Sequence, residues 1–118
     1  MAFVLSLVLL SETPAPAEAQ PAPTFRATCE NLRTATRAHR VDGSELVTIE
    51  VVGTLTIVHS DGTLVYLGMC KAPDSEVLCV TYETGGRKVG DRVVLTGAFN
   101  PRGPDHIQLD PCLHHVPE

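Results

Sequence analysis

The chain has 118 residues, of which 43% are hydrophobic and 4% aromatic, and it carries 9 basic and 14 acidic side chains for a formal net charge of −5. This length allows one domain of ordinary size. An acidic balance argues against a general binder of nucleic acid or other polyanions.

Residues 1–19 resemble a secretory signal peptide. Residues 2–10 read AFVLSLVLL, an apolar block too short to span a bilayer, and residues 17–19 have the small-x-small pattern of a cleavage site. The segment departs from the usual pattern because no Lys or Arg precedes the apolar block. We expect a secreted or periplasmic protein with no membrane span after cleavage. Cleavage would remove Glu12 and Glu18, leaving 9 bases against 14 − 2 = 12 acids, a net charge of −3.

Residues 20–40 are expected to form a Pro/Ala linker and then a basic arm. Residues 14–23 contain four prolines and cannot pack a core. Residues 24–40 hold four arginines against one acid, whereas residues 43–118 hold five bases against ten acids. We therefore expect the arm to lie on the acidic remainder of the chain or to be solvated, rather than to bind a partner.

The secondary structure of the arm is ambiguous from the sequence. As a helix, it would place Cys29, Leu32, Thr36 and His39 on one face; as a strand, residues 36–41 would enter a turn at residues 42–43. We favour a short helix or an irregular arm held by Cys29.

Five short apolar runs separated by turn signals follow from residue 45: residues 45–59, 63–70, 77–83, 93–99 and 106–113. Gly53 and Gly97 lie inside the first and fourth runs, where glycine permits a sharp bend or a bulge. The sequence therefore predicts an all-β domain over residues 41–118, a small closed barrel of five antiparallel strands. Its predicted core comprises Ile49, Val51, Leu55, Ile57, Val65, Leu67, Leu78, Val80, Val93, Leu95, Phe99, Ile107 and Leu109.

Four cysteines in an exported chain predict two disulfides. Alternation along the second and third runs places Cys70 and Cys79 on the same face, which favours a hairpin disulfide between them. Cys29 would then pair with Cys112 and tie the arm to the last strand. The other two connectivities remain open.

The strand order, the long glycine-bent first strand and residues 88–97 (KVGDRVVLTG) resemble the OB-fold superfamily. The resemblance covers residues 45 to about 115, and small secreted bacterial OB-fold proteins also place a signal peptide before such a barrel. One departure is the connection at residues 84–88, which is too short for the helix that OB-folds often carry there. The motif is informative about fold and hardly about function.

The resemblance implies a binding surface on the outer face of the second and third strands and the loops beside it. The side chains expected on that face are Tyr66, Gly68, Cys70, Cys79, Thr81 and Glu83. One aromatic ring without a base offers little for nucleic acid. The predicted ligand-binding residues, including nearby loop bases, are Tyr66, Lys71, Thr81, Glu83, Arg87 and Lys88.

A metal site and an active site are less favoured. His106, Asp110 and His114 share one face of the fifth strand and could form a surface copper or zinc site, but an exposed tail containing histidines is preferred. The sequence carries no recognisable catalytic triad or nucleotide loop. We expect no cofactor and no enzymatic activity.

We therefore expect a non-catalytic secreted or periplasmic binding module for a small molecule, an oligosaccharide or a protein partner. One alternative is a nucleic-acid-binding OB-fold protein that uses the arginine arm, whose affinity would fall steeply with salt. Another is a stabilising accessory subunit of a cell-envelope complex, which predicts an exposed apolar patch or a defined oligomer.

Overall fold

The computed structural model describes residues 25–39 and 47–118 of the chain. The predicted signal peptide, the linker and residues 40–46 lie outside the described residues. The elements are, in chain order, β1 (Phe25–Thr28), α1 (Leu32–His39), β2 (Thr48–Ser60), β3 (Val65–Met69), β4 (Glu76–Thr81), β5 (Arg92–Pro101) and β6 (His106–His115).

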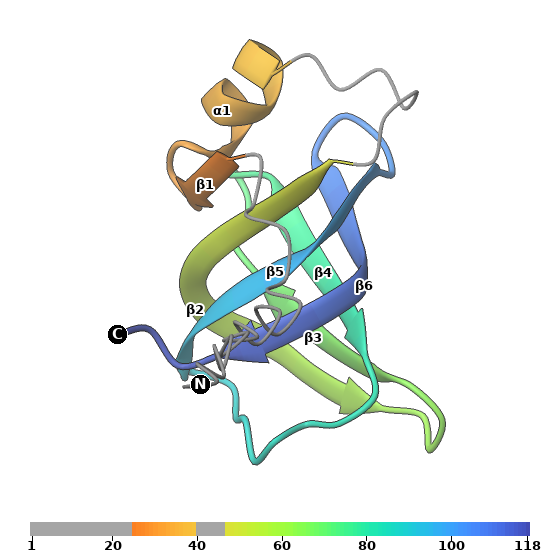
Figure 1. Ribbon diagram of the computed structural model, residues 1–118. Coiled ribbons are helices and arrows are strands. Elements are labelled where there is room, and N and C mark those ends of the chain that lie inside the picture. Colours follow the sequence, from red (N-terminus) through yellow and green to blue (C-terminus); the bar gives the residue numbers. More distant parts are fainter. Residues whose placement is uncertain (1–24, 40–46) are drawn as a thin grey trace, which may run out of the picture.

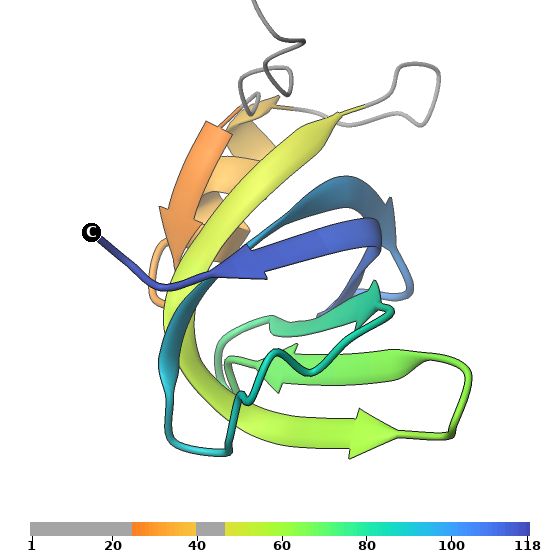
Figure 2. The same cartoon turned by 60° about the horizontal axis from the view of Figure 1, so that its bottom comes forward.

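Five of these strands close into a barrel, as predicted. β2 pairs with β3, β3 with β4, β4 with β6, β6 with β5, and β5 pairs again with β2. Figure 2 shows this ring of strands. Four of the pairs are antiparallel and β4–β6 is parallel, so the prediction of a purely antiparallel barrel is wrong for one pair. The connectivity is compatible with an OB-like fold.

The long strand β2 belongs to two sides of the barrel. Residues 48–54 pair with β5 and residues 55–60 pair with β3. A strand that changes partners in this way must bend, and Gly53 lies at the change, as the sequence predicted. Just beyond it a β-bulge leaves Thr56 as an extra residue, because Leu55 pairs with Met69 but Ile57 pairs with Gly68.

The bulge reverses the inward and outward alternation in the rest of β2. Leu55 is fully buried, but Ile57 is 50% exposed and Val58 packs against the core instead. The prediction of Ile57 as a core residue is therefore wrong. Strict alternation therefore predicts which residues of β2 face the interior only up to the bulge.

The phase of β4, that is, which alternate residues face the interior, is also opposite to the prediction. Val77 and Cys79 belong to the core cluster, whereas Leu78 is half-buried. Val80 is buried, as predicted, but lies outside that cluster. Residues 77–80 are apolar in both phases, so the pattern could not choose between them. Phe99 is partly buried against the core. The remaining predicted core residues are buried: Ile49, Val51, Leu55, Val65, Leu67, Val93, Leu95, Ile107 and Leu109.

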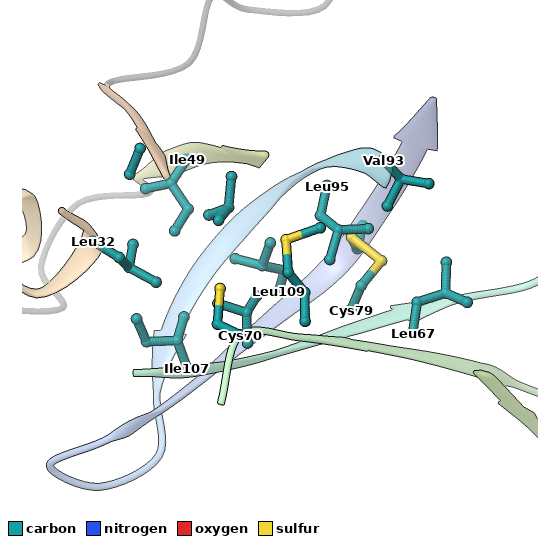
Figure 3. Packing of buried hydrophobic residues seen from close by; sticks show 14 of the residues in the cluster. Leu32, Ile49, Leu67, Cys70, Cys79, Val93, Leu95, Ile107 and Leu109 are labelled. Atoms are coloured by element: carbon teal, nitrogen blue, oxygen red, sulfur yellow. A yellow bond between two sulfur atoms is a disulfide. The ribbon is translucent and has the colours of Figure 1, made fainter. Parts of the chain in front are cut away.

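The N-terminal arm forms a strand and a helix at one end of the barrel (Figure 1). β1, which was not predicted, runs parallel to residues 49–52 of β2. α1 confirms the favoured short helix. Its Leu32 is fully buried and points toward the cluster that contains Ile49 and Ile107 (Figure 3).

Two arginines of the arm form ion pairs with acids of the barrel. Arg26 Nε lies 2.6 Å from Glu50 Oε2. Arg33 Nη2 lies 2.6 Å from Asp105 Oδ1 and also donates to the carbonyl of Pro73 at 2.8 Å. The expectation that the arm lies on the acidic barrel is confirmed for these two side chains.

Disulfides join Cys29 to Cys70 and Cys79 to Cys112. The predicted pairing of Cys70 with Cys79 and of Cys29 with Cys112 is wrong. In the β3–β4 register Cys79 lies opposite Leu67, three residues before Cys70, and its side chain faces the interior. The two sulfur atoms therefore cannot meet across the hairpin.

The Cys29–Cys70 disulfide joins the ends of β1 and β3. Both strands lie on the edge of β2 opposite β5, β1 along residues 49–52 and β3 along residues 55–60. A Cβ placed at Gly53 would lie 2.9 Å from Cys29 Sγ and 3.0 Å from Met69. Gly53 therefore provides the space in which the disulfide and Met69 pack against the bend.

The Gly53→Ala variant should be less stable than the wild type by about 1–3 kcal/mol, because the added methyl group must displace the disulfide or Met69. Chemical denaturation of the oxidised protein measures this change. The exposed neighbour provides the control, since Thr54→Ala should change the free energy of unfolding by less than about 0.5 kcal/mol. Equal stability of the two variants would contradict this account of the bend.

The two disulfides should differ in their rate of reduction in the folded protein. Cys79 and Cys112 are 0% and 4% exposed, whereas Cys29 is partly exposed, and a reducing thiolate must reach a sulfur atom. Mild reduction, alkylation and mass spectrometry should therefore label Cys29 and Cys70 first. Because each disulfide closes a long loop, the chain-entropy model gives each a stabilisation of the folded state of about 4 kcal/mol. Labelling of Cys79 and Cys112 first would show that exposure does not control reduction.

Candidate ligand-binding site

The outer face of β2, β3, β4 and β6 carries two neighbouring rows of side chains that cross the strands. The strand registers define the first row, which comprises Ile57, Gly68, Leu78 and Gln108. The second row contains His59, Tyr66 and Val80. Adjacent strands are about 4.8 Å apart, so each row is a continuous surface across the sheet.

A groove of about 490 Å³ lies over the first row. Its floor includes Ile57, Gly68 and Leu78, and three charged side chains and a histidine line its rim. Small-molecule sites in proteins typically have volumes of about 300–1,000 Å³. The groove therefore has the size of a site for one small ligand.

The apolar floor depends on the absence of a side chain at Gly68. A Cβ placed there would lie 2.9 Å from Ile57 Cβ and 3.1 Å from Ile57 Cδ1, so the side chain of Ile57 lies flat across the glycine. Ile57 nevertheless remains 50% exposed. The floor thus presents a half-exposed branched side chain beside Leu78, held in place by the backbone beneath it.

Three charged residues and one histidine form the rim, at the ends of β3, β4, β5 and β6. Lys71 follows β3, Glu76 begins β4, His106 begins β6 and Arg102 follows β5. Because β4 and β6 are parallel neighbours, Glu76 and His106 lie side by side, with Oε2 and Nδ1 3.1 Å apart.

The two cations of the rim have no acidic partner. Within residues 25–39 and 47–118, neither Lys71 nor Arg102 forms an ion pair. Arg102 Nε donates to Gln108 Oε1 at 3.2 Å, which orients the guanidinium at the edge of the groove. The rim therefore presents two uncompensated positive charges, one on each side of the Glu76–His106 pair.

Arg33 of α1 connects the two loops that carry these cations. Its Nη2 donates both to the carbonyl of Pro73 in the β3–β4 loop and to Asp105 in the β5–β6 loop. The N-terminal arm thus helps to position the rim, although Arg33 itself does not line the groove.

Tyr66, a predicted ligand-binding residue, lies in the second row beside the groove. Its ring stacks on the cross-strand partner His59 with the centroids 6.1 Å apart, and its hydroxyl donates to Asp61 Oδ2 at 3.2 Å. Desolvation of the hydroxyl and the charge of Asp61 both raise the pKa of Tyr66. Tyr66 is therefore engaged with its neighbours and flanks the floor rather than forming it.

Asp61 organises the predicted turn between β2 and β3. Its Oδ1 accepts hydrogen bonds from the backbone N–H groups of Leu64 at 2.7 Å and Thr63 at 2.9 Å. These two bonds, followed by the bond from Tyr66, lower the pKa of Asp61, because each stabilises the carboxylate.

The other predicted ligand-binding residues separate into three groups. Lys71 lines the groove. Thr81 is 6% exposed, so its placement on the outer face is wrong, because β4 has the opposite phase. Glu83, Arg87 and Lys88 lie at or beyond the far end of β4 and are not part of the groove.

Glu83 and Arg87 take part in a separate contact with His114 of β6. Arg87 Nε donates to His114 Nδ1 at 3.0 Å, and His114 Nε2 lies 2.9 Å from the carbonyl of Glu83. Because Nδ1 accepts a hydrogen bond, the proton belongs on Nε2, which donates to that carbonyl. The contact attaches the β4–β5 loop to the last strand.

The structure does not bring the alternative metal ligands together. His106 and His114 are eight residues apart on β6, roughly 26 Å along an extended strand. In the described segments no group of three or more His, Cys, Asp or Glu side chains could hold a metal ion.

Several residues of the groove were missed by sequence reasoning, among them Ile57, Leu78, Glu76 and Arg102, and His106 was considered only as an alternative metal ligand. Ile57 and Leu78 were assigned to the core, because alternation could show neither the bulge in β2 nor the phase of β4. Arg102 and His106 belong to strand ends that become neighbours of Glu76 only through the β4–β6 and β5–β6 pairs. Arg102 and His106 could be assigned to the groove from the sequence only if the strand order were already known.

No protein-family model matches the chain, and no curated protein is significantly similar to it in sequence. Among the described helical residues, no helix is both long enough and apolar enough to cross a membrane.

The Asp61 turn should make a pH-dependent contribution to stability. Because the folded-state pKa is lowered, the contribution is present above the ordinary carboxyl value of about 3.9 and is lost as the pH falls through the folded value. Asp61→Asn keeps an acceptor oxygen but does not titrate, so its melting temperature should fall less than that of the wild type between pH 5 and pH 2, measured by circular dichroism. Asp61→Ala should melt a few degrees lower at neutral pH. Identical acid sensitivity of the wild type and Asp61→Asn would contradict this prediction.

Proposed function

We propose that the protein is a non-catalytic binding module of OB-like fold that acts outside the cytoplasm, in the periplasm or after secretion. Its ligand is a small molecule that binds in the groove above Ile57, Gly68 and Leu78. The observation that carries this proposal is the half-exposed Ile57 side chain lying across Gly68 at the floor of the groove. A ligand that covered this surface would gain about 25 cal/mol per Å² of apolar area removed from water.

The strand connectivity and the KVGDRVVLTG sequence support the OB-like assignment. A long bent first strand pairs with two partners, and the third and fifth barrel strands, β4 and β6, are parallel. The resemblance places ligands on the face that carries the groove.

The two disulfides support a location outside the cytoplasm. All four cysteines are paired, and disulfides persist mainly in oxidising compartments. The signal-peptide pattern of residues 1–19 points in the same direction.

Nucleic-acid binding through the arginine arm has less support. Arg26 and Arg33 already pair with Glu50 and Asp105, so their charges are partly compensated before any phosphate approaches. Arg37 remains exposed, and Arg40 lies outside the described residues.

One observation favours the accessory-subunit alternative. Tyr82, Leu113 and Val116 are 77%, 50% and 61% exposed. All three lie outside the groove. Exposed apolar side chains of this kind could contact a protein partner, and they provide the control for a test of the groove.

The groove can be tested by NMR titration of the ¹⁵N-labelled, oxidised full chain with a panel of small amphiphiles and oligosaccharides. Amide shifts should concentrate at Ile57, Gly68 and Leu78. Ile57→Gln should weaken binding at least about fivefold, because a polar side chain replaces the apolar floor. Leu113→Gln is the matched control, because the side chains of Ile57 and Leu113 are both 50% exposed. This variant should leave the affinity unchanged.

Shifts that centre on Tyr82 and Leu113, or equal effects of the two variants, would contradict the groove as the binding site. The first result would favour the accessory-subunit function.

A further inference from the structure

We propose that the ligand of the groove is a single anionic amphiphile, with an alkyl chain on the floor and a carboxylate, phosphate or sulfate head group at the Lys71–Arg102 rim. This inference rests on the proposed function and adds the chemical class of the ligand. It follows from the juxtaposition of an apolar floor with a rim that holds two unpaired cations.

The shape of the floor suits a linear apolar group. The first row crosses β2, β3 and β4 through Ile57, Gly68 and Leu78, and reaches Gln108 on β6. Three strand spacings make this row about 14 Å long. An alkyl chain lying along the row would contact apolar atoms over most of its length, and each buried methylene should raise the affinity about fourfold.

The charge of the rim suits an anion. Lys71 and Arg102 have no acidic partner in the described part of the chain, and His106 lies 3.1 Å from the one acid of the rim, Glu76. With a neutral His106 the rim charge is 2 − 1 = +1, in a chain whose net charge is −5. A local positive charge on an acidic protein is selective for an anionic group placed there.

The geometry of Arg102 favours a head group with several oxygen atoms. Its Nε is engaged by Gln108 Oε1, whereas its two terminal nitrogens form no hydrogen bond within residues 25–39 and 47–118. A planar guanidinium fixed in this way can donate to two oxygens of one carboxylate, phosphate or sulfate. Lys71 provides a second, flexible charge from the loop on the other side.

Other ligand classes fit the groove less well. A neutral oligosaccharide would leave both cations without a partner. An oligonucleotide needs stacking surfaces, and the ring of Tyr66 is already stacked on His59. A membrane surface is a poor match, because the apolar residues line a groove of about 490 Å³ that suits one molecule.

Three decyl probes, used below their micellar concentrations, separate the contributions of tail and head group. Isothermal titration of the oxidised full chain should give a dissociation constant for decanoate at least about tenfold lower than for decyltrimethylammonium or decyl maltoside. Acetate should bind more weakly than decanoate, because it lacks the tail. The affinity for decanoate should decrease with salt, whereas the affinity for decyl maltoside should not.

Charge-reversal variants test the rim directly. Lys71→Glu and Arg102→Glu should each weaken decanoate binding at least about tenfold and leave decyl maltoside binding within about twofold. Lys88→Glu, which reverses an exposed cation in the β4–β5 loop outside the groove, should have no effect on either probe. Unchanged melting temperatures verify that the variants fold.

The outcomes distinguish the failure of this inference from that of the proposed function. Equal affinities for the three decyl probes, or decanoate binding that resists both reversals, would overturn the anionic head group and leave the groove as a binding site. Sedimentation with anionic vesicles without decanoate binding would replace the monomeric ligand by a membrane surface. If no probe shifts the amides of Ile57, Gly68 or Leu78, the proposed function itself fails.

Discussion

The structure depends on the bend of β2, where one strand leaves β5 and joins β3. A closed barrel with one long first strand requires this change of partner, and the backbone achieves it at Gly53 and the bulge at Thr56. The Cys29–Cys70 disulfide packs over the glycine and joins the ends of β1 and β3 on the same edge. The bend thus closes the barrel and also attaches the N-terminal arm to it.

The bend also creates the floor of the groove. The extra residue at Thr56 turns Ile57 from the core to the outer face, where Gly68 allows its side chain to lie against the backbone. An apolar side chain on the outside of a sheet is ordinarily unremarkable. Here it lies beside the outward-facing Leu78 and below two unpaired cations, so a feature of barrel closure becomes a candidate binding surface.

The N-terminal arm has a corresponding role at the rim. Leu32 anchors α1 in the core, and Arg33 bonds to both the β3–β4 loop and the β5–β6 loop. These loops carry Lys71 and Arg102. Arg33 of the basic arm therefore holds two surface loops together, which agrees with the expectation that the arm lies on the acidic barrel.

The sequence by itself determined the five barrel strands, the glycine at the bend, most of the core and the presence of two disulfides, because these follow from local alternation, turn residues and composition. Only the tertiary structure decided the phase of β4, the outward position of Ile57 and the pairing of Cys29 with Cys70. Each of these depends on a register shift or on a neighbour distant in sequence. A one-residue bulge reverses the faces of every position beyond it, and residues 77–80 are apolar in either phase. Ile57 and Leu78 of the groove are such residues, and only Lys71 among the predicted ligand-binding residues lines it.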